Sequence, residues 1–116
     1  MEKKLLTDEI KKIIAKEDSN AKVILFGSRA RGAAKSESDW DILILLAKPK
    51  VTAKDEQLFR HKLYDLELES GESISTFVYS QSDWNTKLSV TPFYNNVIKE
   101  GIYLWISIKK IILIIV

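Results

Sequence analysis

Two aspartates, a glycine and a serine form the arrangement in this sequence that could do chemistry. An apolar run ends at Gly27-Ser28, ten residues follow, and a second apolar run begins at Asp39-Trp40-Asp41. Because side chains alternate faces along a strand, Asp39 and Asp41 should point the same way, about 7 Å apart. Two carboxylates beside a loop with free backbone N–H groups suit a divalent metal ion that carries a polyphosphate. The pattern therefore indicates nucleotide chemistry.

This spacing resembles the signature of the DNA polymerase β-like nucleotidyltransferases, in which a Gly-Ser pair, ten residues and an Asp-x-Asp lie between two strands. The short chain is similar to the minimal nucleotidyltransferases (MNT) of that superfamily, which are often antitoxin partners of HEPN ribonuclease toxins. The resemblance covers roughly residues 5–104. It implies Mg²⁺ as cofactor, a nucleoside triphosphate such as ATP as substrate, and a HEPN-type toxin as partner protein.

The Gly-Ser pair and the two arginines after it are the candidate nucleotide-binding residues. Gly27 would let the backbone approach a phosphate closely, and Ser28 would add a hydroxyl and an amide to the same oxygens. A turn that merely ends the strand is the alternative for this pair. Arg29 and Arg31 could neutralise the charge of a triphosphate, because a guanidinium group matches phosphate geometry. The alternative for each arginine is a solvated loop side chain.

The two aspartates are the candidate catalytic and metal-binding residues. Asp39 and Asp41 would hold one or two Mg²⁺ ions between the nucleotide phosphates and the attacking hydroxyl. Alternatively, Asp39 caps an element and Asp41 is a buried, hydrogen-bonded carboxylate. Asp41 is followed by the apolar residues 42–44, where a buried carboxylate without a metal or a partner would be unfavourable. Trp40, between the two aspartates, is expected to pack in the core.

The third strand departs from the family pattern. The family supplies a third carboxylate there, but residues 72–78 read ESISTFV, so that position falls on Ser73 or Ser75. Glu72, at the edge of the strand, is the nearby carboxylate and the remaining candidate for a third catalytic residue. In two-metal transfer, the third carboxylate commonly acts as base or ligand for the attacking hydroxyl. Its loss would therefore impair chemistry more than nucleotide binding.

Hydrophobic periodicity predicts alternating helices and strands along most of the chain. In the second long helix, the expected core positions are Leu58, Leu63 and Leu66. The predicted elements are helices over 4–18, 28–32 and 53–69, strands over 22–26, 40–47 and 73–80, a short helix capped around Ser82, and a last helix from Pro92 to Gly101. This order predicts an α/β (α+β) fold in which helices cover a small mixed β-sheet.

Length and composition are those of one domain. With 116 residues, of which 46% are hydrophobic and 29% charged, the chain fits an ordinary soluble globular protein with a modest core. The formal charge of +2 is too small to indicate nucleic-acid binding. The absence of cysteine excludes disulfides and Cys-based zinc sites and fits a reducing cytoplasm. The N-terminal segment mixes acids with lysines, so we expect no signal peptide.

The last residues, 102–116, are the compositional anomaly. They read IYLWISIKKIILIIV, and Lys109 and Lys110 interrupt a run that is shorter than the roughly twenty residues of a membrane span. The segment is β-rich and aggregation-prone in character. An added edge strand, a partner-binding surface and a terminus altered by a frameshift all remain open. We therefore divide the chain into a nucleotidyltransferase domain, 1–104, and an apolar tail, 105–116, expected to be a contact surface.

The sequence thus predicts a metal-dependent nucleotidyltransferase that moves AMP from ATP onto a hydroxyl, with pyrophosphate as the leaving group. The resemblance suggests an acceptor on a HEPN toxin, which fits a chain without an evident acceptor-binding domain. A second hypothesis is an antitoxin that neutralises its toxin by binding, with little or no catalysis. Transfer to a small molecule such as an aminoglycoside is a third hypothesis, and association of identical chains is also open.

Overall fold

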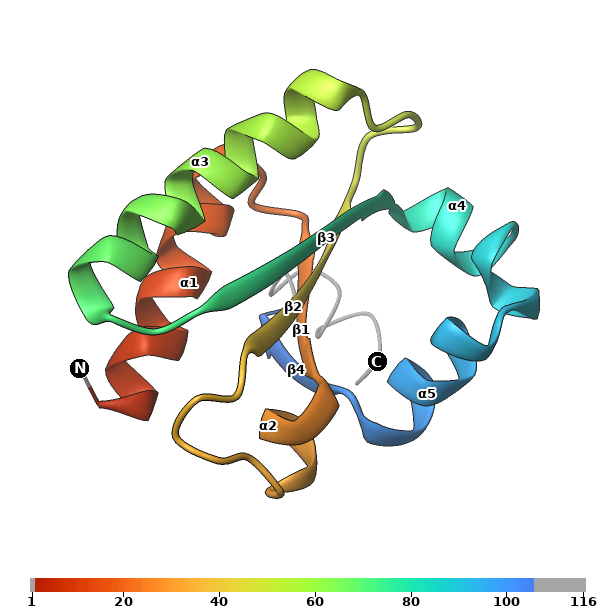
Figure 1. Cartoon of the computed structure of the whole chain (residues 1–116). Helices are drawn as coiled ribbons and strands as arrows, with labels where there is room; N and C mark the ends of the chain where they lie inside the picture. The colour runs from red at the N-terminus through yellow and green to blue at the C-terminus, as the bar shows by residue number, and fades with distance from the viewer. Residues whose placement is uncertain (1, 106–116) are drawn as a thin grey trace, which may run out of the picture.

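A four-stranded sheet organises residues 2–105, the part of the chain that the computed structural model describes (Figure 1). The strand order is β3-β2-β1-β4, with β1 antiparallel to both neighbours and β2 parallel to β3. This confirms the predicted α/β fold with a small mixed sheet. Along the chain the elements are α1 (Lys3–Glu17), β1 (Lys22–Phe26), α2 (Gly27–Arg31), β2 (Trp40–Leu46), α3 (Ala53–Ser70), β3 (Ile74–Ser80), α4 (Gln81–Asn85), the 3₁₀ helix η1 (Leu88–Val90), α5 (Pro92–Glu100) and β4 (Ile102–Trp105).

Alternation along the central strands divides the hydrophobic core into two layers. One set of strand side chains, which includes Val23 and Ile42, packs against α1 and α3. The other set, which includes Ile24 and Leu43, packs against the region of α4 and α5, where Trp84 is buried. Figure 1 shows these two groups of helices on opposite sides of the sheet. We call the two sides the α1/α3 face and the α4/α5 face.

Helix α3 is the crossover between the two parallel strands, and both of its ends are defined by the sequence. The Thr52 hydroxyl accepts a hydrogen bond from the Asp55 backbone N–H, and the Asp55 carboxylate accepts one from the Thr52 backbone N–H in return. The helix ends at Gly71, whose φ of +76° lies in the left-handed region that favours glycine. These two signals fix where β3 begins and hence its register against β2.

The buried stripe of α3 differs from the predicted one at a single position. Phe59, Leu63 and Leu66 are buried, whereas Leu58 is 41% exposed. The prediction of Leu58 as a core residue is therefore wrong. Residues 59, 63 and 66 follow the 3.6-residue period of a helix, and the side chain of the preceding residue is rotated by about 100° from that stripe.

The sheet also contains an added edge strand, one of the three alternatives left open for residues 102–116. β4 pairs with β1 and places Ile102 opposite Leu25 and Tyr103 opposite Ile24. Its residues were grouped with the apolar C-terminal segment, because composition does not separate them from the apolar residues after them. Residues 106–116, which make up most of the expected contact surface, lie outside the described residues. Within residues 2–105, no helix has the length and apolarity that crossing a membrane requires.

A matched pair of leucine substitutions on α3 tests the assignment of its buried stripe. Leu63 is 1% exposed, so Leu63→Ala should lower the free energy of unfolding by about 2–5 kcal/mol through lost burial and a cavity. Leu58→Ala removes the same atoms from the surface and should change it by no more than about 0.5 kcal/mol. Urea denaturation of both variants provides the measurement. Equal losses would contradict the stripe described here.

Candidate functional site

Three neighbouring strands bring the candidate residues together on the α4/α5 face of the sheet. The pairing register places Asp41 of β2 between Phe26 of β1 and Ser75 of β3. Gly27 follows Phe26 directly as the first residue of α2, and Asp39 stands one residue before β2. The two ends of the Gly-Ser to Asp-x-Asp motif therefore meet at one end of the central strand pair.

Asp39 lies close enough to Asp41 to affect the ionisation of the Asp41 carboxyl. Asp41 is half-buried, and this burial raises the pKa of its carboxyl. The negative charge of Asp39 raises the pKa of Asp41 further, while Arg31 lowers it. Asp39 is exposed and accepts a hydrogen bond from the Ser75 hydroxyl at 3.3 Å. Among residues 2–105, none forms a hydrogen bond or an ion pair with the Asp41 carboxylate, so its charge is uncompensated by direct contact.

Gly27 is required by the position of the Asp41 carboxylate. Its φ of +72° lies in the left-handed region, which disfavours residues with a side chain. In addition, a Cβ at this position would lie 2.2 Å from Asp41 Oδ2. The glycine therefore lets the start of α2 lie directly against the carboxylate, and any larger residue would push Asp41 from its place.

Arg29 holds the loop that leads to the aspartates. Its guanidinium donates to the Ser38 carbonyl from Nε at 3.3 Å and from Nη2 at 3.0 Å, and to the Ser36 carbonyl at 3.3 Å. The side chain is only 7% exposed, and its Cζ lies 4.7 Å from the centre of the Trp40 ring. Because Ser38 directly precedes Asp39, these contacts fix the chain at the point where the first carboxylate leaves the loop.

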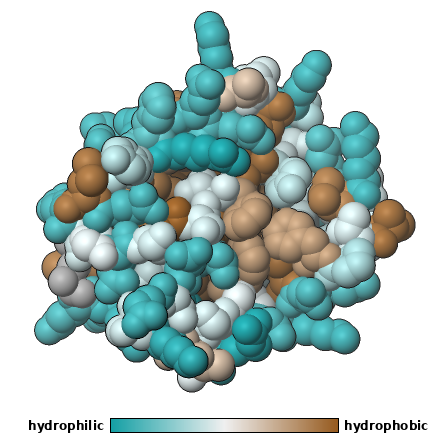
Figure 2. Space-filling view, viewed as in Figure 1, coloured by the Kyte–Doolittle hydropathy of each residue, from teal (hydrophilic) through white to brown (hydrophobic). Residues whose placement is uncertain are grey.

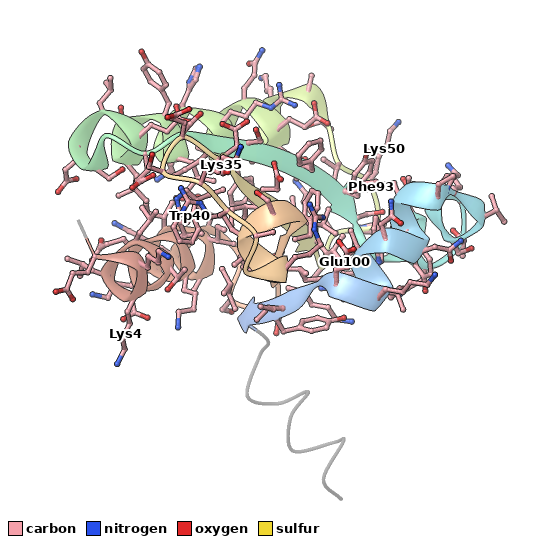
Figure 3. All side chains as sticks on the ribbon, turned by 60° about the horizontal axis from the view of Figure 1, so that its bottom comes forward. Lys4, Lys35, Trp40, Lys50, Phe93 and Glu100 are labelled. Carbon is pink, nitrogen blue, oxygen red and sulfur yellow. The ribbon has the colours of Figure 1, made fainter. Side chains whose placement is uncertain are left out.

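Glu72 belongs to the same group as Arg29. Its Oε2 accepts a hydrogen bond from Trp40 Nε1 at 3.2 Å and lies 3.7 Å from Arg29 Nη2. Trp40 packs in the layer of α1 and α3, on the side of the sheet away from the labelled Phe93 (Figure 3). The β3 residue opposite Asp41 is instead Ser75. Of the two serines considered for the family's third carboxylate, Ser75 is the one that pairs with Asp41.

Arg31, the second arginine of the motif, connects α2 to the end of α5. Its Nη1 lies 3.0 Å from Oε2 of Glu100, and both side chains are substantially solvent-exposed. Figure 3 shows Glu100 beside α2. An exposed ion pair of this kind contributes little to stability, because water screens both charges. Arg31 can therefore exchange its partner for another anion at low energetic cost, unlike the enclosed Arg29.

The arrangement fits a divalent cation that arrives with ligands of its own. Asp39 and Asp41 offer the hard oxygen atoms that Mg²⁺ prefers, and Mg²⁺ is usually bound by one or two carboxylates together with water and substrate phosphates. In the described part of the chain, no group of three or more His, Cys, Asp or Glu side chains is placed to hold a metal ion. The pair of aspartates therefore suits a cation carried by a polyphosphate better than a closed protein site.

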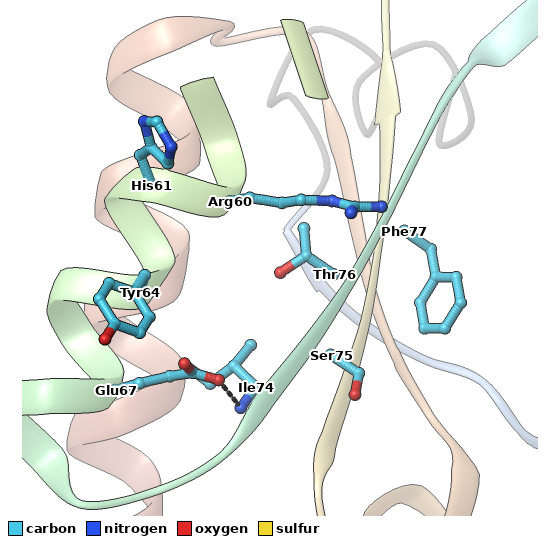
Figure 4. Close-up of a pocket in the computed structure, with 8 residues that line it drawn as sticks. All are labelled: Arg60, His61, Tyr64, Glu67, Ile74, Ser75, Thr76 and Phe77. Atoms are coloured by element: carbon cyan, nitrogen blue, oxygen red, sulfur yellow. Dashed lines mark hydrogen bonds between the residues drawn. The ribbon is translucent and has the colours of Figure 1, made fainter. Parts of the chain in front are cut away.

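An open cleft adjoins this site at the edge of the sheet. It has a volume of about 490 Å³ and lies between α3 and β3 (Figure 4). Thr76 points toward α3, whereas the side chains of Ser75 and Phe77 turn to the other side of the strand. At the end of the cleft, the Glu67 carboxylate accepts a hydrogen bond from the Ile74 backbone N–H. Ser75 thus belongs both to the cleft lining and to the surroundings of Asp39.

Comparison with protein families gives a match over most of the chain. The model of the nucleotidyltransferase domain matches residues 7–104, which include the whole motif and all four strands up to Leu104. The chain belongs to the nucleotidyltransferase domain family. A comparison with curated proteins gives no significant match to this nucleotidyltransferase.

Solved structures of similar fold include toxin–antitoxin complexes. A chain from a toxin–antitoxin structure with AMP-PNP matches this nucleotidyltransferase with a TM-score of 0.65 and 18% identity, over 90% of this chain and 76% of that one. A chain from the structure of a tri-AMPylated Shewanella oneidensis HEPN toxin in complex with MNT antitoxin matches with a TM-score of 0.61 and 17% identity. This match covers 95% of this chain and 77% of that one. At the level of the fold, these matches confirm the resemblance to the minimal nucleotidyltransferases.

The sequence analysis missed the group formed by Arg29, Trp40 and Glu72. The last of these residues is far from the others in sequence, and their meeting depends on the parallel pairing that sets Trp40 opposite Ile74. A tryptophan expected in the core was the available signal, because a buried indole N–H usually has an acceptor. Nothing in the sequence indicated which acceptor that would be.

Substituting two glycines with the same backbone conformation tests the contact between Gly27 and Asp41. Gly27 and Gly32 both have φ of +72°, but no atom lies within 4 Å of a Cβ built on Gly32. Gly32→Ala should therefore cost only the strain of the left-handed conformation, about 1–2 kcal/mol. Gly27→Ala should cost at least about 1 kcal/mol more, because Asp41 must also move. Chemical denaturation at pH 7 measures both, and equal losses would contradict the close approach.

The raised pKa of Asp41 predicts that its charge weakens the fold without a cation. A carboxyl whose pKa is raised on folding destabilises the protein at pH values above that pKa, and the effect disappears as the pH falls through it. Without metal or nucleotide, Asp41→Asn should therefore melt a few degrees higher than the unsubstituted chain at pH 7. The difference should close toward about pH 4, near the ordinary pKa of aspartate. Thermal melts across this range would refute the assignment if the variant melts lower at neutral pH.

Proposed function

We propose that this protein transfers a nucleoside monophosphate, AMP from ATP, onto a hydroxyl group of a partner protein. The observation that carries the proposal is the half-buried Asp41 carboxylate, which has no donor among the described residues and lies beside Asp39. Gly27 packs against this carboxylate and leaves room for phosphate oxygens. Membership of the nucleotidyltransferase domain family agrees with such a site.

In this proposal, Asp39 and Asp41 hold Mg²⁺, which when bound neutralises charge on the phosphates and on the attacking oxygen. Gly27 and Ser28 place backbone and hydroxyl groups beside the phosphates. Arg31 is the cation that turns to the triphosphate, because its present partner, Glu100, is an exposed one. The chain therefore contributes mainly positioning and charge compensation, which are the major sources of rate in phosphoryl-type transfer.

Arg29 acts in this scheme as a positioning residue. Its guanidinium is enclosed by the Ser36 and Ser38 carbonyls, the Trp40 ring and Glu72, so it is not free to bind a phosphate. Glu72 likewise supports the loop from the α1/α3 side and does not serve as the third carboxylate. We therefore assign the initial candidates Arg29 and Glu72 to holding Asp39 in place.

Proton removal from the acceptor hydroxyl is the step for which the described residues provide no evident base. In the transfer, the acceptor oxygen forms a bond to the α-phosphorus, and the bond from that phosphorus to the pyrophosphate oxygen breaks. The acceptor proton must pass to a base, and Ser75, opposite Asp41, is not one at neutral pH. Water or a group on the partner would accept the proton in the native chain, which makes transfer by the chain alone slow.

The partner we propose is a HEPN-type toxin, for which this chain would be the antitoxin, acting in the cytoplasm. Support comes from the similar folds found in toxin–antitoxin structures, one with AMP-PNP and one with a tri-AMPylated HEPN toxin. The modified toxin in that structure makes AMP the group we expect to be transferred. A cysteine-free chain agrees with a reducing compartment.

A second candidate function is neutralisation of the toxin by binding, with nucleotide bound but transferred slowly or not at all. The observation that favours it is Ser75, which lies opposite Asp41 on β3 and offers a hydroxyl where a carboxylate could act as base. The two candidates share the metal and phosphate site and differ in turnover. A substitution that places a carboxylate at position 75, where it could act as the base, therefore distinguishes the two candidate functions.

Restoring a carboxylate at Ser75 tests the proposed function. The unsubstituted chain should bind Mg-ATP, and the double variant Asp39→Asn/Asp41→Asn should lose at least about tenfold in affinity by calorimetry. With a co-produced HEPN-type partner and labelled ATP, Ser75→Asp should raise transfer about 10²-fold, the lower range for a general base. Ser75→Asn is the matched control, because it has similar size but cannot take the proton.

The outcomes separate the hypotheses. Unchanged Mg-ATP affinity in the double aspartate variant would refute the metal assignment. Fast transfer by the unsubstituted chain without a partner would show that its base lies elsewhere. Binding of Mg-ATP without transfer, in both the native chain and Ser75→Asp, would favour the binding-only antitoxin.

A further inference from the structure

Three phenylalanines from different elements form a cluster next to the aspartates. The ring centres of Phe26 and Phe77 are 5.4 Å apart, those of Phe26 and Phe93 are 5.3 Å apart, and those of Phe77 and Phe93 are 5.7 Å apart. Phe26 ends β1, Phe77 lies in β3, and Phe93 lies in the first turn of α5. We call these three residues the Phe cluster.

The register places the Phe cluster on the same face as the metal-binding candidates. Phe26 is directly opposite Asp41 on β1, and Ser75 is opposite Asp41 on β3. Phe77 is two residues beyond Ser75, on the same face of the strand and about 7 Å farther along it. A ligand whose phosphates are held at Asp41 would therefore meet aromatic rings within the length of one nucleotide.

The Phe cluster packs against the core of this layer without being enclosed by it. The fully enclosed residues of this layer are Ile24, Leu43 and their neighbours, whereas the three phenylalanines are only partly buried. Figure 2 shows apolar surface at the centre of this side of the molecule, with hydrophilic side chains around it. Exposed apolar surface that adjoins a charged site is typical of a ligand-binding surface.

The aspartates and the neighbouring Phe cluster together indicate the chemical class of the ligand. Paired carboxylates call for a cation with phosphate, and the neighbouring rings call for a flat apolar group linked to that phosphate. A nucleobase meets the second requirement, because each base has a π-face that stacks on aromatic side chains. The apolar surface at the centre of Figure 2 shows that this face is open to a ligand.

We propose that the Phe cluster is the nucleobase subsite, with Phe77 as its principal stacking surface, and that it favours purine over pyrimidine triphosphates. The inference rests on the proposed function, since it requires the phosphates to lie at Asp39 and Asp41. Selection comes from stacking area, which is larger for a two-ring base. Phe26 and Phe93 support the Phe77 ring from the two flanking elements.

Substitutions that keep or remove the aromatic ring test the subsite in the intact chain. Phe77→Leu keeps apolar volume but loses the ring face, and it should lower Mg-ATP affinity about tenfold in calorimetric titration. Phe77→Tyr keeps the ring and should stay within about twofold of the unsubstituted chain. Mg-tripolyphosphate, which has no base, should bind both variants as it binds the unsubstituted chain. A merely structural role for Phe77 would lower the affinity for both ligands.

Phe59→Leu is the matched control, because Phe59 is a buried phenylalanine of the α1/α3 layer. It removes the same ring from the core and should leave Mg-ATP affinity unchanged, with folding checked by circular dichroism. Mg-CTP should bind the unsubstituted chain more weakly than Mg-ATP, and Phe77→Leu should reduce that difference.

Three results would overturn the subsite: equal loss of ATP and tripolyphosphate in Phe77→Leu, no loss of either, or equal affinities for ATP and CTP. Failure of tripolyphosphate to bind, with ATP binding intact, would refute the phosphate site of the proposed function. The subsite would then fall with it, because it requires the phosphates at Asp39 and Asp41, whereas the three results above overturn the subsite alone. Absence of all nucleotide binding would overturn both proposals.

Discussion

An uncompensated carboxylate within the sheet is the constraint on which the site depends. β2 is buried along almost its whole length, and Asp41 is the one residue of the strand that carries charge. Its neighbours do not pair with this charge. Gly27 has no side chain to offer, and Ser75 donates its hydroxyl to Asp39 instead. Filling this space with a donor would make the fold more stable and the site less suited to a cation, a common exchange between stability and activity.

The two faces of the sheet are coupled through Arg29, although the chemistry lies on only one of them. Its guanidinium reaches the loop carbonyls before Asp39, and its stacking partner Trp40 is buried among residues from α1 and α3. Glu72 joins the same group from the start of β3. The helical layer that forms the larger core therefore also sets the position of a charged loop on its margin. Such support from packed elements is what keeps a site in its working geometry.

The sequence determines the local features of this fold more clearly than the contacts between distant segments. The motif from Gly27 to Asp41 and the two long helices follow from spacing and residue type alone. The sequence could not show whether Ser73 or Ser75 lies opposite Asp41, because this depends on a parallel register that is set by where α3 ends. An edge strand at β4 stayed one of three alternatives for a related reason, since an apolar C-terminal run does not reveal which strand it will join.

The hydrogen bond from the Ile74 N–H to the Glu67 carboxylate affects self-association of the protein through its sheet edge. β3 is an edge strand, and the outward-facing amides of such an edge are a template for another chain. Glu67, from the crossover helix beside it, occupies the first of these amides with a charged side chain. An approaching strand would have to displace that carboxylate before pairing with the start of the edge. The crossover helix thus also discourages edge-to-edge aggregation, beside a cleft that stays open to smaller ligands.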